Sequence, residues 1–334
     1  MLQMGIIGYG YWGPNLVRNF NVAAGSQVSM VCDMNKQSLS KAKKAYPQVR
    51  FTSDVNELIN DPEVNAVAIA TPVFTHHELA KKALLAGKSV FVEKPFTHTV
   101  EEAEELIELA EKKKLKIMVD HTFLYTGAVR KIKQLIDDNV LGSIYYFDSV
   151  RVNLGLFQHD VNVVWDLAPH DIAIMDYLIN DKPQAVVATG SGHFDRGLED
   201  IAYLTFYYPN NIIAHINVNW LSPVKVRTTL IGGQKKMLVW NDLEPDEIIK
   251  VYDKGVKVTT TEGKYNLLVN YRSGDMWAPR IQATEALRLI AEEFVHYVEE
   301  GGKVVNDGAA GLKVVKMLVA SSKSLKNKGE MIYL

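Results

Sequence analysis

Short apolar runs alternate with amphipathic stretches over the first third of the chain. The runs occupy residues 2–7, 28–32, 67–70, 89–92 and 116–119, and the stretches between them carry apolar residues at helical spacing. Continuous apolar strands separated by helices are typical of a parallel sheet that is covered on both faces. We therefore predict an α/β domain, with helix starts marked by three capping-box pairs: Asp54 with Glu57, Thr75 with Glu78, and Thr99 with Glu102.

The pattern changes beyond residue 121. After a helix predicted over residues 127–138, β-rich runs follow at 143–153, 185–189, 201–208, 212–220, 225–231, 237–240, 248–252 and 256–261. Turn signals such as Asp253-Lys254-Gly255 join several of these runs, and consecutive strands on short turns pair antiparallel. Further helices are predicted near 164–179, 283–300 and 307–324. We expect two domains, residues 1–120 and 121–334, of which the second is α+β.

A glycine-rich segment follows the first apolar run. Gly8, Gly10 and Gly13 form Gly-x-Gly-x-x-Gly between a predicted strand and a predicted helix. There the first glycine allows the turn, the second lets a pyrophosphate approach, and the third lets helix pack on strand. The second run ends at Asp33, 20 residues after Gly13, which suits a carboxylate that binds ribose hydroxyls. The glycines alone could form an ordinary turn, but together with Asp33 they predict a site for NAD rather than NADP.

The overall composition excludes several functions. A formal net charge of -2 provides no basic surface for nucleic acid. No apolar run reaches the roughly 18 residues of a membrane span, and the amino terminus lacks signal-peptide regions, so we expect a cytoplasmic protein. Cys32, the only cysteine, lies in an apolar run, where a buried, inert thiol is expected. We predict no metal site, because a His-Glu-x-x-His motif starting at His77 would need histidine where Lys81 stands.

Glu93-Lys94-Pro95 follows the fourth apolar run. Ligands bind beyond the carboxyl ends of parallel strands, and a lysine there can exchange a proton with a substrate. A solvated loop is the alternative interpretation for this segment.

Asp166 and His170 stand four residues apart in a predicted helix, with Pro169 expected in its first turn. Their side chains would share one helix face and contact one substrate. A capping aspartate and a structural histidine fit the spacing equally well. Arg151 and Asn153 add polar groups upstream of this helix, as a hydroxyl-rich ligand would require, although a polar loop is also compatible.

In these motifs the chain resembles the Gfo/Idh/MocA oxidoreductases over essentially its full length. The resemblance rests on the glycine motif, on Ala70-Thr71-Pro72 with His76, on Glu93-Lys94-Pro95, and on Asp166 with His170. It implies a Rossmann domain over residues 1–120 and, in the remainder, a large open, mostly antiparallel sheet that commonly builds homodimers or homotetramers. It also implies a Lys94–Pro95 bond that is often cis in the family.

The same resemblance implies roles for individual residues. Lys94 corresponds to the lysine near the nicotinamide, His170 to the proton-transferring histidine and Asp166 to its carboxylate companion; either His170 or Lys94 could be the base. The implied cofactor-binding residues are Gly8, Gly10, Tyr11, Trp12, Gly13, Asp33, Thr71, Pro72, His76, Glu93 and Lys94. The implied substrate-binding residues are Lys94, His121, Tyr125, Arg151, Asn153, Asp166 and His170.

The sequences of two short segments resemble one branch of the family. His121-Thr-Phe-Leu-Tyr125 and Arg151-Val-Asn-Leu-Gly155 resemble the branch that oxidises nucleotide sugars, and Val163-Val-Trp165 replaces the glycine-rich approach of many members. We expect NAD-dependent oxidation of a sugar hydroxyl, at C3 of a UDP-linked N-acetylamino sugar or its uronate, with Arg151 on the diphosphate. An inositol or aldose dehydrogenase, a ketosugar reductase, and a catalytically idle NAD-binding regulator are the alternatives.

Overall fold

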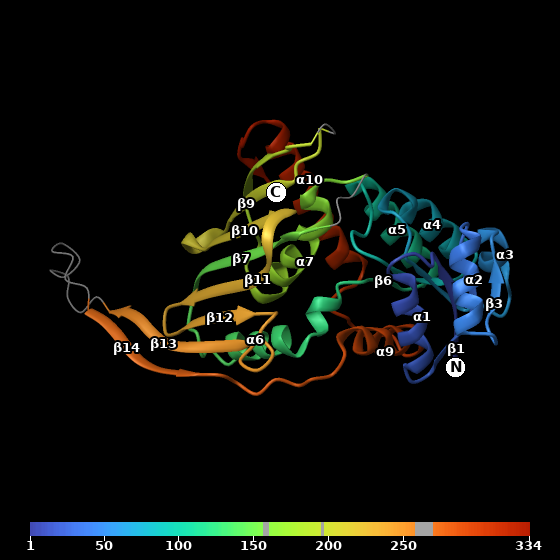
Figure 1. Ribbon diagram of the computed structural model, residues 1–334, viewed down its shortest axis with the longest axis horizontal. Coiled ribbons are helices and arrows are strands. Elements are labelled where there is room, and N and C mark those ends of the chain that lie inside the picture. Colours follow the sequence, from blue (N-terminus) through green and yellow to red (C-terminus); the bar gives the residue numbers. More distant parts are fainter. Residues whose placement is uncertain (156–159, 195–196, 258–269) are drawn as a thin grey trace. The chain divides into compact units, whose positions relative to one another are not determined.

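The computed structural model describes residues 1–155, 160–194, 197–257 and 270–334, and the chain divides into two compact units (Figure 1). The first unit comprises Met1–Thr126 and Thr284–Lys316, and the second comprises Gly127–Ala283 and Met317–Leu334. Residues 284–316 therefore belong with the amino-terminal part of the chain, although the sequence pattern grouped them with the second domain.

The first unit is built on a parallel sheet whose described strands run in the order β3-β2-β1-β4-β5-β6. The strands are β1 (Leu2–Ile7), β2 (Ser26–Cys32), β3 (Arg50–Thr52), β4 (Ala66–Ile69), β5 (Ser89–Val92) and β6 (Ile117–Val119). The helices are α1 (Gly13–Val22), α2 (Lys36–Ala45), α3 (Val55–Asn60), α4 (His76–Leu85), α5 (Val100–Lys113) and α9 (Ala286–Glu299), with short 3-10 turns η1 (Val73–Thr75) and η2 (Thr122–Tyr125). This is the strand order of a Rossmann fold, and the predicted α/β class is confirmed.

Both faces of the parallel sheet are covered, as the continuous apolar strands require. Helices α3, α4 and α5 contribute buried side chains to the core on one face. On the other face Phe20 of α1, Phe91 of β5 and Phe294 of α9 pack edge to face, with ring centroids 5.4 to 6.0 Å apart. Because Phe294 completes this aromatic cluster, α9 is part of the first unit.

The capping predictions met different outcomes. Thr99 and Glu102 form the predicted capping box at the start of α5. The other two boxes are wrong. Asp54 does cap α3, but Glu57 accepts a hydrogen bond from a neighbouring threonine hydroxyl instead of closing the box. Thr75 ends η1, and its hydroxyl donates to a backbone carbonyl within that turn.

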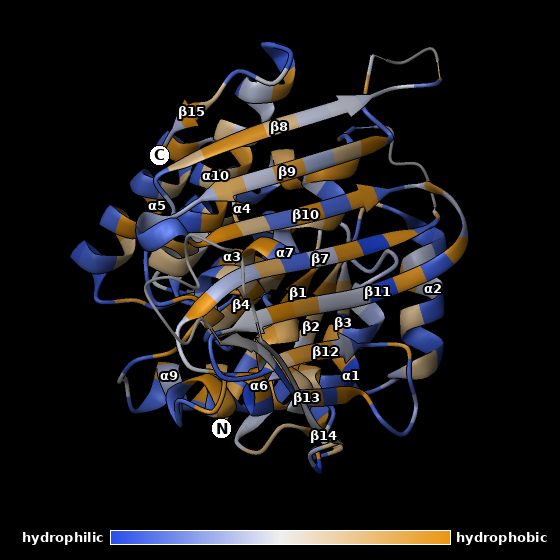
Figure 2. Cartoon of the chain, turned by 90° about the vertical axis from the view of Figure 1, so that its left-hand side faces the viewer, coloured by the Kyte–Doolittle hydropathy of each residue, from blue (hydrophilic) through white to orange (hydrophobic). Residues whose placement is uncertain are grey.

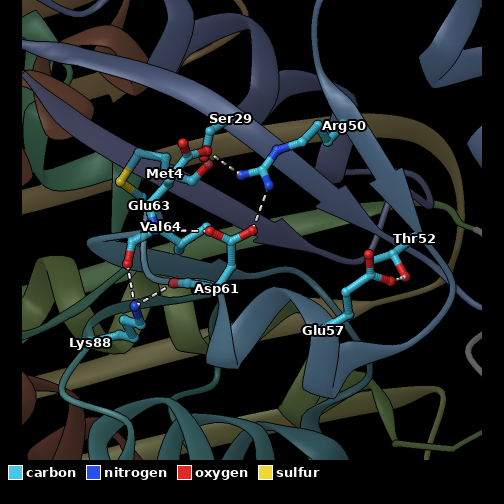
Figure 3. Close-up of polar contacts among 9 residues, drawn as sticks. All are labelled: Met4, Ser29, Arg50, Thr52, Glu57, Asp61, Glu63, Val64 and Lys88. Atoms are coloured by element: carbon cyan, nitrogen blue, oxygen red, sulfur yellow. Dashed lines mark hydrogen bonds and ion pairs between the residues drawn. The ribbon is translucent and has the colours of Figure 1, made fainter.

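A polar cluster lies at the amino ends of β3, β4 and β5, on the edge opposite the glycine motif (Figure 3). Arg50 forms ion pairs with Asp61 at 2.6 Å and Glu63 at 3.1 Å. The buried ammonium of Lys88 donates to the carbonyl oxygens of Asp61, at 2.8 Å, and Val64. These groups satisfy one another and join α3 to the sheet, so we assign the cluster a structural role.

The second unit is built on a mixed sheet whose described strands run in the order β14-β13-β12-β11-β7-β10-β9-β8-β15 (Figure 2). The strands are β7 (Ile144–Leu154), β8 (Ala185–Ser191), β9 (Ile201–Tyr207), β10 (Ile213–Asn219), β11 (Leu221–Gly233), β12 (Met237–Asn241), β13 (Ile249–Lys257), β14 (Asn270–Trp277) and β15 (Ile332–Tyr333). Strands β7 and β10 pair parallel, whereas the other described neighbours pair antiparallel, which confirms the mostly antiparallel sheet. The helices are α6 (Gly127–Asp137), α7 (Val163–Leu178) and α10 (Gly308–Lys326), which begins in the first unit, with the 3-10 turn η3 (Pro209–Asn211).

Two local predictions for this unit are wrong. Asp253-Lys254-Gly255 is not a turn, because β13 runs through it and absorbs the irregularity as a register shift after Tyr252. The strand predicted at 256–261 begins as the end of β13, and residues 258–261 lie outside the described residues. Pro169 is the seventh residue of α7, which begins at Val163, and so lies beyond the first turn. No helix in the described part of the chain is long and apolar enough to cross a membrane.

Candidate active site

The glycine motif follows β1 directly and leads into α1. Gly8 has a φ of 97°, and a Cβ atom there would stand 2.4 Å from the carbonyl oxygen of Ala70. A Cβ atom at Gly13 would stand 2.1 Å from the carbonyl oxygen of Gly8, whereas one at Gly10 would meet nothing within 4 Å. The outer two glycines are therefore required by the protein itself, and the middle one leaves backbone open to a ligand. Since no side chain caps α1 at Trp12, the helix start can receive a phosphate.

Asp33 follows β2 and turns back toward the glycine motif. Its carboxylate accepts a hydrogen bond from the backbone N–H of Tyr9 at 2.6 Å and another from that of Asn35 at 2.7 Å. These bonds hold the carboxylate beside the loop that would carry the pyrophosphate. A carboxylate fixed in this place can accept hydrogen bonds from ribose hydroxyls and repels a 2′-phosphate.

We expect Asp33→Asn to shift cofactor preference toward NADP. The amide retains the size of the side chain but loses the charge that opposes the 2′-phosphate, so the Kd ratio of NADPH to NADH should fall about tenfold, or ~1.4 kcal/mol. Both Kd values can be measured by the fluorescence of the reduced nicotinamide. Glu63→Gln, which removes an exposed carboxylate at the opposite edge, is the control. An unchanged ratio in Asp33→Asn would contradict the assigned role.

His76 connects two loops at the carboxyl edge of the sheet. Its ring nitrogens lie 2.8 Å from the carbonyl oxygen of Thr71, after β4, and 2.9 Å from that of Pro95, after β5. Burial lowers the pKa of His76, so the neutral ring donates to one of these carbonyls at a time. The ring thereby fixes the Thr71-Pro72 and Lys94-Pro95 segments, and we interpret His76 as a positioning residue for the cofactor loops. The Lys94–Pro95 bond is cis, as the resemblance implied.

Glu93 and Asp120 directly follow the adjacent strands β5 and β6. Strand pairing places Val92 opposite Val119, so the two carboxylates follow in register. Asp120 accepts hydrogen bonds from the indole N–H of Trp12, at 3.0 Å, and from a threonine hydroxyl. The glycine motif is thus joined to the end of β6 by Trp12, whereas the neighbouring Tyr11 is 86% exposed.

His121 is buried after β6, and neither ring nitrogen has a hydrogen-bond partner among the described residues. Burial lowers the pKa of His121 to about 4, an effect that nearby Lys94 reinforces and Asp120 opposes. Tyr125 is also buried, and its hydroxyl donates to Asn306 at 2.8 Å. Of these two predicted substrate residues, His121 therefore has unfilled hydrogen-bonding capacity, whereas Tyr125 contacts the interior of its own unit.

Acid should destabilise the cofactor-free protein through His121. Its folded-state pKa, about 4, is below the ordinary 6.5, so the stability contribution is present above pH 6.5 and is lost as the pH falls through 4. The loss should approach roughly 3 kcal/mol, at about 1.4 kcal/mol per pKa unit. Urea unfolding at pH 7 and pH 4 should show a smaller acid effect in His121→Gln than in the wild type. An equal acid effect in both proteins would disprove the assignment.

In the second unit, α7 presents Asp166 and His170 together. Among the first eight residues of α7, Asp166, Leu167 and His170 are partly exposed and the others are buried. Asp166 accepts a hydrogen bond from the indole N–H of Trp220 at 3.0 Å. Asn162 is the N-cap, accepting from the backbone N–H of Trp165 at 3.2 Å, so Asp166 is not needed as a cap. The predicted pair therefore shares an accessible face of the helix.

Arg151 has a different environment from the one predicted. It lies on β7, 5% exposed, and its guanidinium bonds both carboxylate oxygens of Asp171 on α7, at 2.5 and 3.2 Å. Such a buried, bidentate pair engages the same fork of donors that would bind a diphosphate. We therefore do not assign Arg151 to the nucleotide, and we interpret it as fixing α7 on the sheet. Asn153, two residues further along β7, is only half-buried and stays a candidate substrate residue.

Chemistry other than that of the motifs is sparse in the described residues. They contain no group of three or more His, Cys, Asp or Glu side chains that could hold a metal ion. Cys32 is buried, and burial raises the pKa of its thiol to about 11, so it is a poor nucleophile. Asp120 and Trp220 were not predicted as site residues. Their partners, Trp12 and Asp166, are 108 and 54 residues away in sequence, beyond the reach of any local motif.

Comparison with known proteins agrees with this geometry. Residues 2–121 match the NAD-binding Rossmann domain of the Gfo/Idh/MocA oxidoreductases, and residues 129–239 match the C-terminal domain of the same family. The chain belongs to the Gfo/Idh/MocA family. The Gfo/Idh/MocA family is one of oxidoreductases, and the domain that the first unit matches is its NAD-binding Rossmann fold. The orphaned ring of His121 and the open backbone at Gly10 fit such a cofactor.

Several known proteins are similar to this member of the Gfo/Idh/MocA family. It is 33% identical over 181 residues to the uncharacterised oxidoreductase YdgJ of Escherichia coli (strain K12), covering 51% of each chain. UDP-N-acetylglucosamine 3-dehydrogenase GnnA of Acidithiobacillus ferrooxidans has the same fold, with a TM-score of 0.79, 24% identity and 98% of each chain covered. So does aldose-aldose oxidoreductase of Caulobacter crescentus, with a TM-score of 0.84, 18% identity, and 100% and 99% covered. The chain spans about half the length of the first curated relatives it matches.

Proposed function

We propose that this protein oxidises a secondary hydroxyl of a sugar with NAD, at C3 of a UDP-linked N-acetylamino sugar or of its uronate. The observation that carries the proposal is the pairing of Asp166 and His170 on the accessible face of α7. Asp166 is fixed by Trp220 at 3.0 Å, and the N-cap role belongs to Asn162, so capping does not account for the pair. A catalytically idle regulator would need neither side chain.

The chemistry divides between the cofactor and the chain. NAD, when bound, supplies a hydride acceptor at its nicotinamide. The chain has to position the sugar and remove the hydroxyl proton, because a carbonyl can form only as that proton leaves. His170 or Lys94 is the base in this proposal. The Asp166 carboxylate accepts a hydrogen bond from a sugar hydroxyl and holds the ring in place.

The nucleotide part of the substrate is inferred from separate observations. It rests on the amino-acid sequences of residues 121–125 and 151–155 and on the fold shared with UDP-N-acetylglucosamine 3-dehydrogenase. One observation favours a second candidate, the oxidation of a free aldose or inositol or the reverse reduction of a ketosugar. Arg151, the arginine expected to bind the diphosphate, is instead paired with Asp171 inside the second unit. A sugar without a diphosphate would not need it.

The open sheet of the second unit suggests self-association as a homodimer or homotetramer. Tyr203 and Tyr207 on β9 and Ile213 on β10 expose apolar side chains on neighbouring strands. Exposed apolar residues grouped on a sheet face mark contact surfaces. Light scattering of the purified protein would measure the assembly, and a monomer at micromolar concentration would disprove it.

A substrate panel tests the proposed function. Purified protein is incubated with NAD or NADP and with UDP-N-acetylglucosamine, its uronate, free N-acetylglucosamine, inositols and aldoses, while NADH formation is followed by absorbance. We expect turnover with a UDP-sugar and NAD, and its loss in Asp166→Asn. Equal kcat/KM values for a free sugar and its UDP form would refute the nucleotide-sugar assignment. Binding of NAD without turnover of any sugar would favour the regulator.

A further inference from the structure

Glu93 and Asp120 are two carboxylates buried side by side in the first unit. Their exposed fractions are 8% and 2%, and they follow the register pair Val92 and Val119 at the ends of adjacent strands. The backbone N–H of Asp120 donates to the carbonyl oxygen of Val92 at 2.7 Å, which fixes this juxtaposition. Two adjacent buried carboxylates cannot both be ionised without a large cost, so such a pair retains a proton.

The hydrogen bonds decide which carboxylate holds the proton. Asp120 accepts from the Trp12 indole on one oxygen and from the Thr122 hydroxyl on the other, and both donors favour its charged form. Glu93 accepts only a 3.2 Å bond from the Lys94 backbone N–H on Oε2, and its Oε1 has no partner among the described residues. Burial and, next, the charge of Asp120 raise the pKa of Glu93 well above the usual value, although Lys94 opposes this.

We propose that Glu93 and Asp120 share one proton, held on Glu93, and that binding of oxidised NAD releases this proton to solvent whereas binding of NADH leaves it in place. This inference rests on the proposed NAD-dependent reaction. The structural elements are the buried acid pair and the unpartnered Glu93 Oε1 at the edge where the glycine motif also lies. Trp12, a residue of that motif, contacts the pair directly at 3.0 Å.

The reason for the release is the charge of the nicotinamide. The ring is a cation in NAD and neutral in NADH, and a cation near a carboxyl group favours its ionised form. A pair with one proton has a net charge of -1, and after release its charge is -2. The second negative charge offsets the charge of the oxidised ring. When hydride transfer neutralises the ring, the pair takes up one proton from solvent again.

The two buried histidines near the pair do not account for such a proton. Lys94 and His121 are the charged or ionisable neighbours that act on Glu93 or share its surroundings. Burial lowers the pKa of His121 to about 4, so that ring is neutral throughout the range from pH 6 to 9 and has no proton to lose. His76 forms its contacts with two backbone carbonyls, and burial lowers its pKa as well.

Calorimetric titration of cofactor binding tests the inference. The protein is titrated with NAD and, separately, with NADH in two buffers that differ in protonation enthalpy, which gives the number of protons released. We expect NAD binding to release nearly one proton per protein. The Kd of NAD should therefore fall by up to about tenfold for each unit by which the pH is raised. NADH binding should release none, and its Kd should stay flat over the same range.

Two variants separate this linkage from a structural role. Glu93→Gln cannot lose a proton, so NAD binding should become independent of pH and weaken relative to NADH. Asp120→Asn removes the charge that holds the proton on Glu93, so proton release should persist but move to lower pH. Glu101→Gln, an exposed carboxylate in the same unit, should behave as the wild type and is the matched control.

The outcomes are distinguishable from failure of the proposed function. If neither nucleotide binds, the NAD-dependent reaction itself is refuted. If both bind and release equal numbers of protons, or if Glu93→Gln releases as many as the wild type, only the shared proton is refuted. Should Glu93→Gln not fold, the Asp120→Asn titration decides, because unshifted proton release in that variant would overturn the proposal.

Discussion

His170→Ala is expected to lower kcat by about 10²–10⁴-fold, the usual contribution of a general base, without changing the fold. The imidazole lies on the partly exposed face of α7, next to Asp166, where it can take a proton from a bound hydroxyl. Alanine is a good helix former, so the helix itself should persist. Stopped-flow or steady-state formation of NADH on the substrate identified by the panel gives kcat, and circular dichroism verifies the fold.

Two comparisons make this result specific. His215→Ala removes a histidine from the second unit, on β10, and should leave kcat within about twofold, as expected for a surface site. Asp166→Asn keeps an oxygen that can accept from Trp220, so it should impair substrate binding more than stability. If His170→Ala and Asp166→Asn both turn over normally, α7 is structural and the proposed mechanism is wrong.

Lys94→Met should abolish most turnover, by at least about 100-fold, while leaving the affinity for NAD within about threefold. Methionine retains much of the apolar length of the lysine stem, so lost packing is not the explanation of a large effect. What disappears is the ammonium group of the Lys94-Pro95 segment, whose Pro95 carbonyl contacts His76. Kd for NADH by fluorescence and kcat from the same preparation separate cofactor binding from chemistry.

The control for Lys94 is Lys81→Met, which removes an exposed ammonium that pairs with Glu105 at 2.5 Å. That variant should retain wild-type kinetics, because surface ion pairs contribute little. Wild-type turnover in Lys94→Met would support the alternative interpretation, in which Lys94 belongs to an ordinary solvated loop. A collapse of NADH binding with intact kcat at saturation would instead make Lys94 a cofactor ligand.

The features that could be predicted from the sequence are those determined by neighbouring residues. Gly8 and Gly13 are required by a turn and a helix contact within the same short segment, so their spacing alone reveals them. The strands of the first unit are continuously apolar because helices cover both faces. The Asp166 and His170 pairing follows from helical periodicity, which needs no knowledge of tertiary structure.

The features that could not be predicted depend on residues distant in sequence. From the sequence alone, Arg151 is a candidate phosphate ligand. Only the packing of α7 on β7 supplies Asp171 as its partner. The same holds for Asp120, whose importance arises from strand register rather than from any motif. The turn signal at residues 253–255 failed because pairing with β14 keeps the strand extended through it.

Placement of α9 in the first unit has a consequence for how a nascent chain folds. The aromatic cluster of Phe20 and Phe91 is completed by Phe294, which leaves the ribosome long after the six parallel strands have been made. Until then the ribosome carries a sheet with an exposed aromatic face, the kind of surface that binds chaperones and aggregates. A chain stopped at residue 126 should therefore be poorly soluble, whereas one in which a short linker joins residue 126 to residue 284 regains the covering helix. The dinucleotide-binding unit is therefore completed late, although its synthesis begins first.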